Sequence, residues 1–225
     1  MQHIRICCTC TAFVEYATLV RRLVECPETG GAEIGETQLV RLLAAADPRP
    51  DALTAFRIAR RWFIAGRRIE MRELAAELDV NRATLFRWVG SRDALLAEIV
   101  WSLAKPTWET SVAGTAGHGG VRVAAVLGRF ATLVDGADYF RDFLRREPER
   151  AMRVVMTRAG TVQGRMVDAV ETLLKDEGIV SQLPSHDLAY VIVRIVESFL
   201  YADIITGEQP DTAKVEQAIG ALLVH

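Results

Sequence analysis

Residues 71–89 read MRELAAELDVNRATLFRWV, and apolar side chains recur along them with the spacing of two short helices joined by a tight turn. Five of these side chains are predicted to face one shared core: Leu74, Leu78, Val80, Leu85 and Val89. Ala75 is small enough for the two helices to cross closely. The segment therefore has the spacing of a helix-turn-helix.

The turn between the two helices also has suitable residues. The backbone at Asp79 needs a positive φ, which aspartate tolerates better than most residues. Asn81 then offers a side-chain oxygen as the N-cap of the second helix. We expect this second helix to expose a polar face that is cationic at its amino-terminal end.

In helix-turn-helix proteins, the amino-terminal end of the second helix contacts base edges in the major groove. Arginine donates two hydrogen bonds to guanine, and threonine contacts a thymine methyl, so Arg82 and Thr84 are the candidates for base contacts. Arg72 is expected to reach a base or a phosphate, and Arg92, just after Ser91 at the next helix start, a phosphate. The full predicted DNA-binding set is Arg72, Asn81, Arg82, Ala83, Thr84, Phe86, Arg87, Trp88 and Arg92.

An alternative interpretation of this segment is a set of ordinary amphipathic helices with a solvated arginine face. The local charge favours DNA, because residues 51–104 contain nine arginines and seven acids, a net charge of +2. The whole chain carries a net charge of −2, which by itself singles out no nucleic acid, acidic substrate or membrane as the partner.

Helical periodicity continues on both sides of this segment, and no alternating apolar run with hairpin signals occurs, so the sequence predicts an all-α protein. Helices are predicted over residues 12–25, 36–46, 51–65, 71–78, 81–89 and 91–104, and, after Lys105-Pro106 and a glycine-rich stretch, over 121–134, 139–146, 149–159, 162–177, 185–205 and 211–224. The predicted domains are a partly helical extension (1–50), a three-helix helix-turn-helix domain (51–104) and a second helical domain (105–225).

All four cysteines lie in the extension: Cys7, Cys8, Cys10 and Cys26. We expect loosely ordered thiols there rather than a zinc site with His3, because zinc ligands usually come in pairs separated by loops. Neither a metal nor a cofactor is predicted. No window of about eighteen uncharged apolar residues occurs and the first ten residues lack an export leader, so we expect a cytoplasmic protein that does not span a membrane.

Polar side chains form a stripe along the predicted helix over residues 185–205: Tyr190, Arg194, Glu197 and Tyr201. Three interpretations stay open for this stripe: a solvated face with an Arg194–Glu197 ion pair, a dimer contact, and part of a ligand pocket. A pocket also needs apolar walls, although aromatic and methionine residues on helices are typical of a plain core as well. The candidate ligand-binding residues are Trp108, Phe130, Phe143, Met152, Met156, Tyr190 and Arg194.

Together, four segments resemble the amino-terminal DNA-binding domain of the TetR family of bacterial transcriptional regulators, over about residues 51–104: AFRIARRWF (55–63), MRELA (71–75), NRATLFRWV (81–89) and SRDALL (91–96). The resemblance implies a homodimer on a roughly palindromic DNA operator. It also implies that the carboxy-terminal helical domain binds a small-molecule ligand and dimerises through its last long helices. In its overall order the chain is similar to a TetR subgroup that includes regulators of lactone-signal degradation, which points to a small hydrophobic effector of the lactone or acyl class.

Three residues depart from the family pattern. Phe86 stands where the family usually has tyrosine, so a phosphate contact through a phenol oxygen is lost while the packing survives. Arg92 stands for the usual lysine and keeps the phosphate-binding charge. Glu70 lies where a threonine often caps the first helix of the motif and meets a phosphate, so it places a repulsive acid near DNA.

The sequence therefore predicts a sequence-specific DNA-binding transcriptional regulator, a ligand-responsive repressor of the TetR type. The alternative is a ligand-independent architectural or division-site DNA-binding protein. An enzyme is not predicted, although His118-Gly119-Gly120 and Ser185-His186-Asp187 resemble catalytic sequences. The chain has no G-x-S-x-G elbow, and adjacent residues at a helix start point in different directions.

Overall fold

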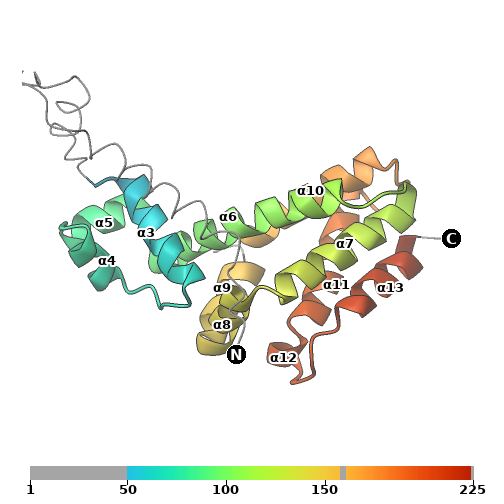
Figure 1. The fold of residues 1–225 in the computed structure, drawn as a ribbon. Coiled ribbons are helices and arrows are strands. Elements are labelled where there is room, and N and C mark those ends of the chain that lie inside the picture. Colours follow the sequence, from blue (N-terminus) through green and yellow to red (C-terminus); the bar gives the residue numbers. More distant parts are fainter. Residues whose placement is uncertain (1–49, 158–160, 224–225) are drawn as a thin grey trace, which may run out of the picture. The chain divides into compact units, whose positions relative to one another are not determined.

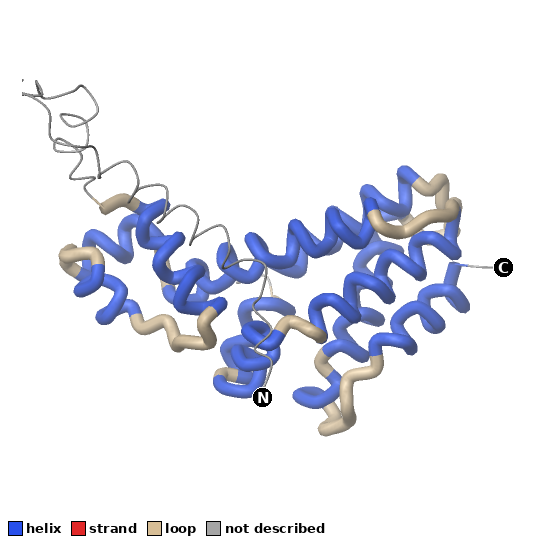
Figure 2. Tube along the Cα trace, in the orientation of Figure 1, coloured by secondary structure: helices blue, strands red, loops and turns tan. Residues whose placement is uncertain are grey.

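The computed structural model describes residues 50–157 and 161–223, and in these ranges the chain forms helices without strands (Figures 1 and 2). The helices are α3 (Ala52–Ile64), α4 (Met71–Glu77), α5 (Arg82–Val89), α6 (Arg92–Ala113), α7 (Gly119–Asp135), α8 (Asp138–Arg146), α9 (Pro148–Met156), α10 (Val162–Asp176), α11 (Ser185–Leu200), α12 (Ala202–Ile205) and α13 (Thr212–Leu223). The predicted all-α fold is confirmed. The helices predicted over 12–25 and 36–46, and the four cysteines, lie outside the described residues.

Helices α3, α4 and α5 share one apolar core with part of α6. Of the five predicted core residues, Leu74, Leu78 and Leu85 are buried, whereas Val80 and Val89 are half-buried at the edge of the same core. The helix α3 begins at residue 52 because Asp51 caps it: the Thr54 backbone N–H donates to Asp51 Oδ1 at 2.7 Å. The shared apolar core holds α4 and α5 against α3 as a helix-turn-helix.

The helix α6 is longer than the sequence predicts. It was expected to end at residue 104, before Lys105-Pro106, but it continues to Ala113 with Pro106 inside it. A proline in a helix interior removes one backbone hydrogen bond, so propensity alone favours the earlier end. Tertiary packing prevails here, because Trp108 and Ser111 are buried beyond the proline. The predicted domain boundary at residues 104/105 thus falls within one continuous helix.

A second apolar core lies between α7, α10, α11 and α13, with Leu127, Val170, Ile192 and Ile219 essentially fully buried in it. The helices α7 and α13 approach closely at Gly128, where a Cβ atom would come within 2.8 Å of the Glu216 Cβ. Helix α6 contacts both halves: α3 and α5 on one side, and α7, α9 and α10 on the other (Figure 1).

Two other predicted helices are shorter than expected. The helix predicted over 185–205 ends at Leu200, and the short α12 follows, because the backbone at Tyr201 leaves helical geometry with φ −111° and ψ 23°. The Tyr201 ring turns instead toward the first core, 6.3 Å from the Phe140 ring centroid. Helix α9 ends at Met156, three residues before the predicted end at residue 159. Among the described helices, none has the length and apolar character needed to cross a membrane.

Candidate functional site

The turn before α5 has the geometry that the sequence predicts. Asp79 adopts a positive φ of 51°, which ends α4 and redirects the chain. Asn81 caps α5, because its Oδ1 accepts a hydrogen bond from the Thr84 backbone N–H at 2.8 Å. These two residues fix the direction in which α5 leaves the core, and therefore which of its side chains face solvent.

The outward face of α5 is cationic and partly apolar. Arg82, Ala83 and Arg87 are exposed, and the Phe86 ring is 38% exposed. The Arg82 guanidinium lies over this ring, 5.7 Å from its centroid, so the phenylalanine holds the arginine that was predicted to contact bases. Thr84 and Trp88 are half-buried at the edges of this face, while Leu85 is fully buried beneath it.

Three arginines on α4 and α5 have no acidic partner among the described residues. Within residues 50–157 and 161–223, no ion pair involves Arg72, Arg82 or Arg87. All three are exposed. We call these three residues, with Asn81, Ala83, Thr84, Phe86 and Trp88, the recognition surface. Such unpaired cations are the groups that displace counterions from DNA phosphates.

Glu70 also lies beside this surface, at the start of α4. It occupies the N-cap position, and its side chain makes no capping hydrogen bond. Arg68 Nε lies 2.6 Å from Glu70 Oε1 and forms an exposed ion pair with it. The repulsive acid expected from the sequence is therefore matched by a neighbouring cation.

Arg92 differs from the other predicted DNA-binding residues. Its side chain is only 11% exposed, and Nη2 donates a hydrogen bond to Glu147 Oε1 at 2.7 Å. The buried Nε of Arg92 has no partner among the described residues. Arg92 therefore differs from the exposed arginines of the recognition surface, because its guanidinium is nearly buried and already has an acidic partner.

The start of α6 is joined to α9 by further ion pairs. Asp93 accepts hydrogen bonds from Arg150 at 2.6 Å and from Arg153 at 2.9 Å. Arg150 Nε also lies 3.2 Å from Glu147 Oε2. We call Arg92, Asp93, Glu147, Arg150 and Arg153 the junction network. It ties the helix that follows the recognition surface to the helices on which the second half of the chain is built.

Farther along α6, the structure contains an apolar cavity of about 80 Å³. Its wall comes from several helices, chiefly α6 (Val100, Leu103, Ala104 and Thr107), α7 (Leu127, Phe130, Leu133 and Val134), α10 (Val162, Gln163 and Met166) and α11 (Val193, Val196, Glu197 and Leu200), with Phe63, Ala137, Tyr139, Phe140, Val155 and Tyr201 from neighbouring segments. An apolar wall with few polar groups is the usual character of a small-molecule site.

The predicted ligand residues are placed unevenly around this cavity. Phe130 lines it, and Trp108 packs edge-on behind Phe130, with ring centroids 5.6 Å apart. Phe143 packs in the first core against Phe63, at 5.3 Å. Met152 and Met156 pack at the edge of that core, and Tyr190 is exposed. Helical periodicity identifies buried faces, but it does not distinguish a cavity wall from a filled core.

The polar stripe on α11 divides between two environments. Arg194 Nη1 donates to Glu197 Oε2 at 2.6 Å, so the ion pair considered for this stripe is present. Glu197 and Tyr201 line the cavity, whereas Tyr190 lies outside it. Burial raises the pKa of the Glu197 carboxyl to about 7, against the opposing effect of Arg194. Burial, and the nearby Glu197, also raise the pKa of Tyr201, so its hydroxyl stays protonated.

Glu197 was not among the predicted ligand residues, nor were Tyr201 and Gln163. A signal was available in the sequence, since a glutamate within a largely apolar helical segment is unusual unless it has a partner or a function. Gln163 carries no comparable signal, because it lies near a helix start where polar residues are common.

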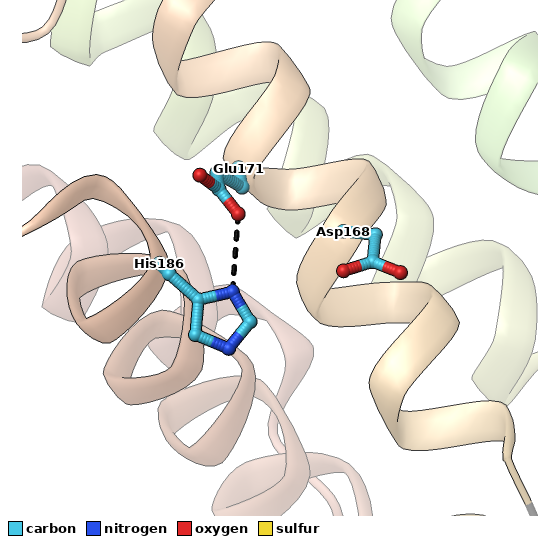
Figure 3. A group of neighbouring side chains, drawn as sticks. All are labelled: Asp168, Glu171 and His186. Atoms are coloured by element: carbon cyan, nitrogen blue, oxygen red, sulfur yellow. Dashed lines mark hydrogen bonds and ion pairs between the residues drawn. The ribbon is translucent and has the colours of Figure 1, made fainter.

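A group of side chains that could ligate a metal lies outside the cavity, on α10 and α11: Asp168, Glu171 and His186 (Figure 3). Both oxygens of Glu171 already have partners, because Oε1 pairs with Lys175 at 2.6 Å and Oε2 lies 3.0 Å from His186 Nδ1. The hydrogen bonds from Lys175 and His186 lower the pKa of Glu171. The geometry is that of a surface ion network, and it also directs His186 toward Glu171.

Comparison with known proteins finds a family profile and a solved structure that are similar to this chain. Residues 118–224 match the sequence profile of the tetracyclin repressor-like C-terminal domain. The chain is also similar to the solved structure of the R. erythropolis transcriptional repressor QsdR from the TetR family, with 26% sequence identity and a TM-score of 0.71. This match covers 76% of this chain and 93% of that chain, so it extends beyond the profile match. A search of curated proteins found no match.

Proposed function

Since this chain is a DNA-binding transcriptional regulator of the TetR family, we propose that it is a repressor that a small apolar effector releases from its operator. In this proposal, two copies of the chain place their recognition surfaces in successive major grooves of a roughly palindromic site. Arg82 and Thr84 contact bases there, with Arg72 and Arg87 at a base or the backbone. The effector enters the cavity on the α6–α11 side.

The observation that carries this proposal is the course of α6. Only two residues separate the end of α5 from the start of this helix, and farther along it supplies Val100, Leu103, Ala104 and Thr107 to the cavity wall. Packed cores resist continuous deformation, so a ligand that enlarges the cavity must move the helices around it. A shift of α6 changes the position of the recognition surface, because the two are joined without a flexible linker.

The junction network offers a second way in which a movement of the helices can change DNA binding. Arg92 is held by Glu147 in the structure described here, and we propose that it exchanges this carboxylate for a phosphate when the protein binds its operator. An effector that favours the Arg92–Glu147 pair would then disfavour DNA. This is a population shift between two arrangements, which requires only that the effector bind one of them more tightly.

The homodimer is proposed from the family and from the exposed surface of α11. Val191 is 39% exposed, and Ile195 and Phe199 follow it on the same side as half-buried apolar residues. On α13, Leu222 is half-buried as well. Apolar side chains of this kind on two neighbouring helices suit a helical interface between copies of the chain.

The test begins with selection of binding sequences from random duplex DNA by the purified full chain. Apolar compounds are then screened for those that raise the melting temperature, and the hits are titrated into the protein–operator complex while fluorescence anisotropy is recorded. We expect at least one hit to release the operator. No hit that releases DNA would favour the ligand-independent architectural protein instead.

A matched pair of variants separates the cavity from the rest of α6. Ala104→Leu adds bulk to the cavity wall, whereas Ala113→Leu makes the same change at an exposed site on the same helix. We expect Ala104→Leu to weaken effector binding about tenfold or more, and Ala113→Leu to leave it unchanged. Both variants should bind the selected operator like the natural chain when no effector is present.

A further inference from the structure

The cavity has one charged residue in its wall, and this residue indicates what the cavity binds. Glu197 is only 7% exposed and is the single ionisable acid or base among the described lining residues, the tyrosines apart. Its neighbours on the wall are almost entirely apolar, including Val193, Val196 and Leu200 from the same helix. A carboxyl group in such surroundings costs free energy unless its hydrogen-bonding capacity is satisfied.

The carboxylate of Glu197 is satisfied on one side only. Oε2 accepts the hydrogen bond from Arg194 Nη1 at 2.6 Å. Within the part of the chain that the structure describes, Oε1 accepts no hydrogen bond. The wall therefore presents one carboxylate oxygen that has no hydrogen-bond partner among the described residues, and because this atom is not fully covered by protein a molecule in the cavity can reach it.

Arg194 is not available to bind a ligand in place of Glu197. Its Nη1 donates to Glu197, its Nη2 to the Met156 backbone carbonyl at 3.3 Å, and its Nε to the Tyr190 hydroxyl at 3.2 Å. Each guanidinium nitrogen thus makes one hydrogen bond, and Arg194 is not among the residues that line the cavity. A ligand carboxylate would find the Glu197 charge on the wall without a free cation to oppose it, and repulsion between the two anions would weaken its binding.

From this geometry, and resting on the proposed sensor function, we propose that the effector is an apolar molecule with one O–H or N–H donor that pairs with Glu197 Oε1, and that carboxylate-bearing molecules are excluded. The hydrocarbon part of the effector fills the apolar wall, and the donor supplies the missing partner. Within the acyl class, this selects compounds with an amide N–H or a hydroxyl, and it rejects free fatty acids.

The size of the cavity sets the choice of probes. At about 80 Å³ it suits a slender chain better than a bulky ring system unless the helices separate. Four probes each contain a linear chain of eight carbons, which in octanoate includes the carboxyl carbon, and they differ at the head group: octan-1-ol, octylamine, methyl octyl ether and octanoate. The alcohol and the protonated amine donate hydrogen bonds, the ether only accepts them, and octanoate is an anion.

The experiment measures the dissociation constant of each probe for the full chain by isothermal titration calorimetry at pH 8.5, above the Glu197 pKa of about 7, together with the shift in melting temperature. A hydrogen bond to a charged group corresponds to about tenfold to a hundredfold in affinity. We therefore expect octan-1-ol and octylamine to bind at least about tenfold more tightly than methyl octyl ether, and octanoate to bind most weakly. Equal affinities for all four head groups would overturn the proposal.

Two variants test whether Glu197 is the partner. Glu197→Gln removes the charge at nearly constant shape, so we expect octylamine to lose about tenfold in affinity and octanoate to gain. Glu109→Gln makes the same chemical change on α6 at an exposed site outside the cavity wall, and it should change none of the affinities. If Glu197→Gln leaves the order of the probes unchanged, the donor is recognised elsewhere and the proposal fails.

The failure of this inference can be distinguished from the failure of the sensor function. If the four probes bind alike and Ala104→Leu abolishes them all, the cavity binds apolar molecules but the head-group preference is wrong. If no probe and no screened compound binds the chain at all, the sensor function fails together with this inference, while binding to the selected operator is unaffected.

Discussion

The recognition surface and the junction network are both rich in arginine, but they differ in whether the arginines are paired with acids. Arg72, Arg82 and Arg87 are exposed and have no acidic partner among the described residues, whereas Arg92, Arg150 and Arg153 are each paired with Glu147 or Asp93. Unpaired cations are available to a polyanion, and paired cations hold helices together. As an indicator of DNA binding, the number of arginines in a segment is therefore less useful than the number of arginines that have no acidic partner.

Burial separates the two regions as well. Arg92 and Glu147 have side chains only 11% and 13% exposed, while the arginines of the recognition surface are open to solvent. Removing one partner of a buried pair leaves the other charged, desolvated and unpaired, which costs far more than removing an exposed charge. The comparison can thus be tested by substitutions that remove one charge at a time.

The largest effect is expected in the junction network. Glu147→Ala leaves the buried Arg92 without its carboxylate and also removes a partner of Arg150, so we expect the free energy of unfolding to fall by about 3 kcal/mol. Chemical denaturation followed by circular dichroism measures this change. As a control, Glu73→Ala breaks the exposed pair with Arg67 and should cost no more than about 1 kcal/mol. Equal losses in the two variants would show that the junction is an ordinary surface.

The next effect contrasts Arg82 with Arg92 on DNA. Arg82→Ala should cost about 1–3 kcal/mol of binding to the selected operator and relax the base preference at one position, because it removes a base contact. Arg92→Ala should weaken binding to all duplexes alike and flatten the dependence of log affinity on log salt by about one unit. Fluorescence anisotropy over a salt series, with the operator and single-base variants, measures both.

The same series contains the results that contradict these assignments. A loss of sequence preference in both variants would place Arg92 at a base, and an unchanged salt slope for Arg92→Ala would show that Arg92 keeps its pair with Glu147 on DNA. The folded fraction of each variant is checked first, because Arg92→Ala also removes a partner of Glu147.

How far the sequence predicts these regions depends on the range of the interactions that build them. The cap at Asn81 and the positive φ at Asp79 depend on residues three or fewer positions apart, so local backbone chemistry predicts them. The Arg92–Glu147 pair joins positions 55 residues apart, and no local pattern indicates it. For the same reason the sequence places Arg92 at a phosphate but does not reveal the carboxylate that already holds it.

The cavity shows the same limit on a different scale. Periodicity predicts correctly that α10, α11 and α13 are helices, and the mid-helix Pro106 misleads only because packing beyond it lies outside the local pattern. Which buried side chains border empty space depends on how four helices fit together. Phe130 is on the wall and Trp108 is behind it, although the two are equivalent as aromatic residues in a sequence.

The smallest expected effect is a pH dependence of stability that comes from Glu197, a buried acid with fewer cationic partners than Glu147. Glu147 has three arginines around it, whereas Glu197 has Arg194 alone, and its pKa of about 7 lies above the usual 4.5. Between these values the unfolded chain loses the Glu197 proton while the folded chain keeps it, so stability falls as the pH rises from about 4.5 to 7 and levels off above.

We expect this fall to be of order 1 kcal/mol, because Arg194 and partial solvent access moderate it. Thermal unfolding from pH 5 to pH 8 measures the effect, and Glu197→Gln is the reference because it lacks only this carboxyl group. The natural chain should lose melting temperature relative to Glu197→Gln as the pH rises. Parallel curves for the two proteins would mean that Glu197 is ionised throughout, and that its pair with Arg194 resembles the junction pairs after all.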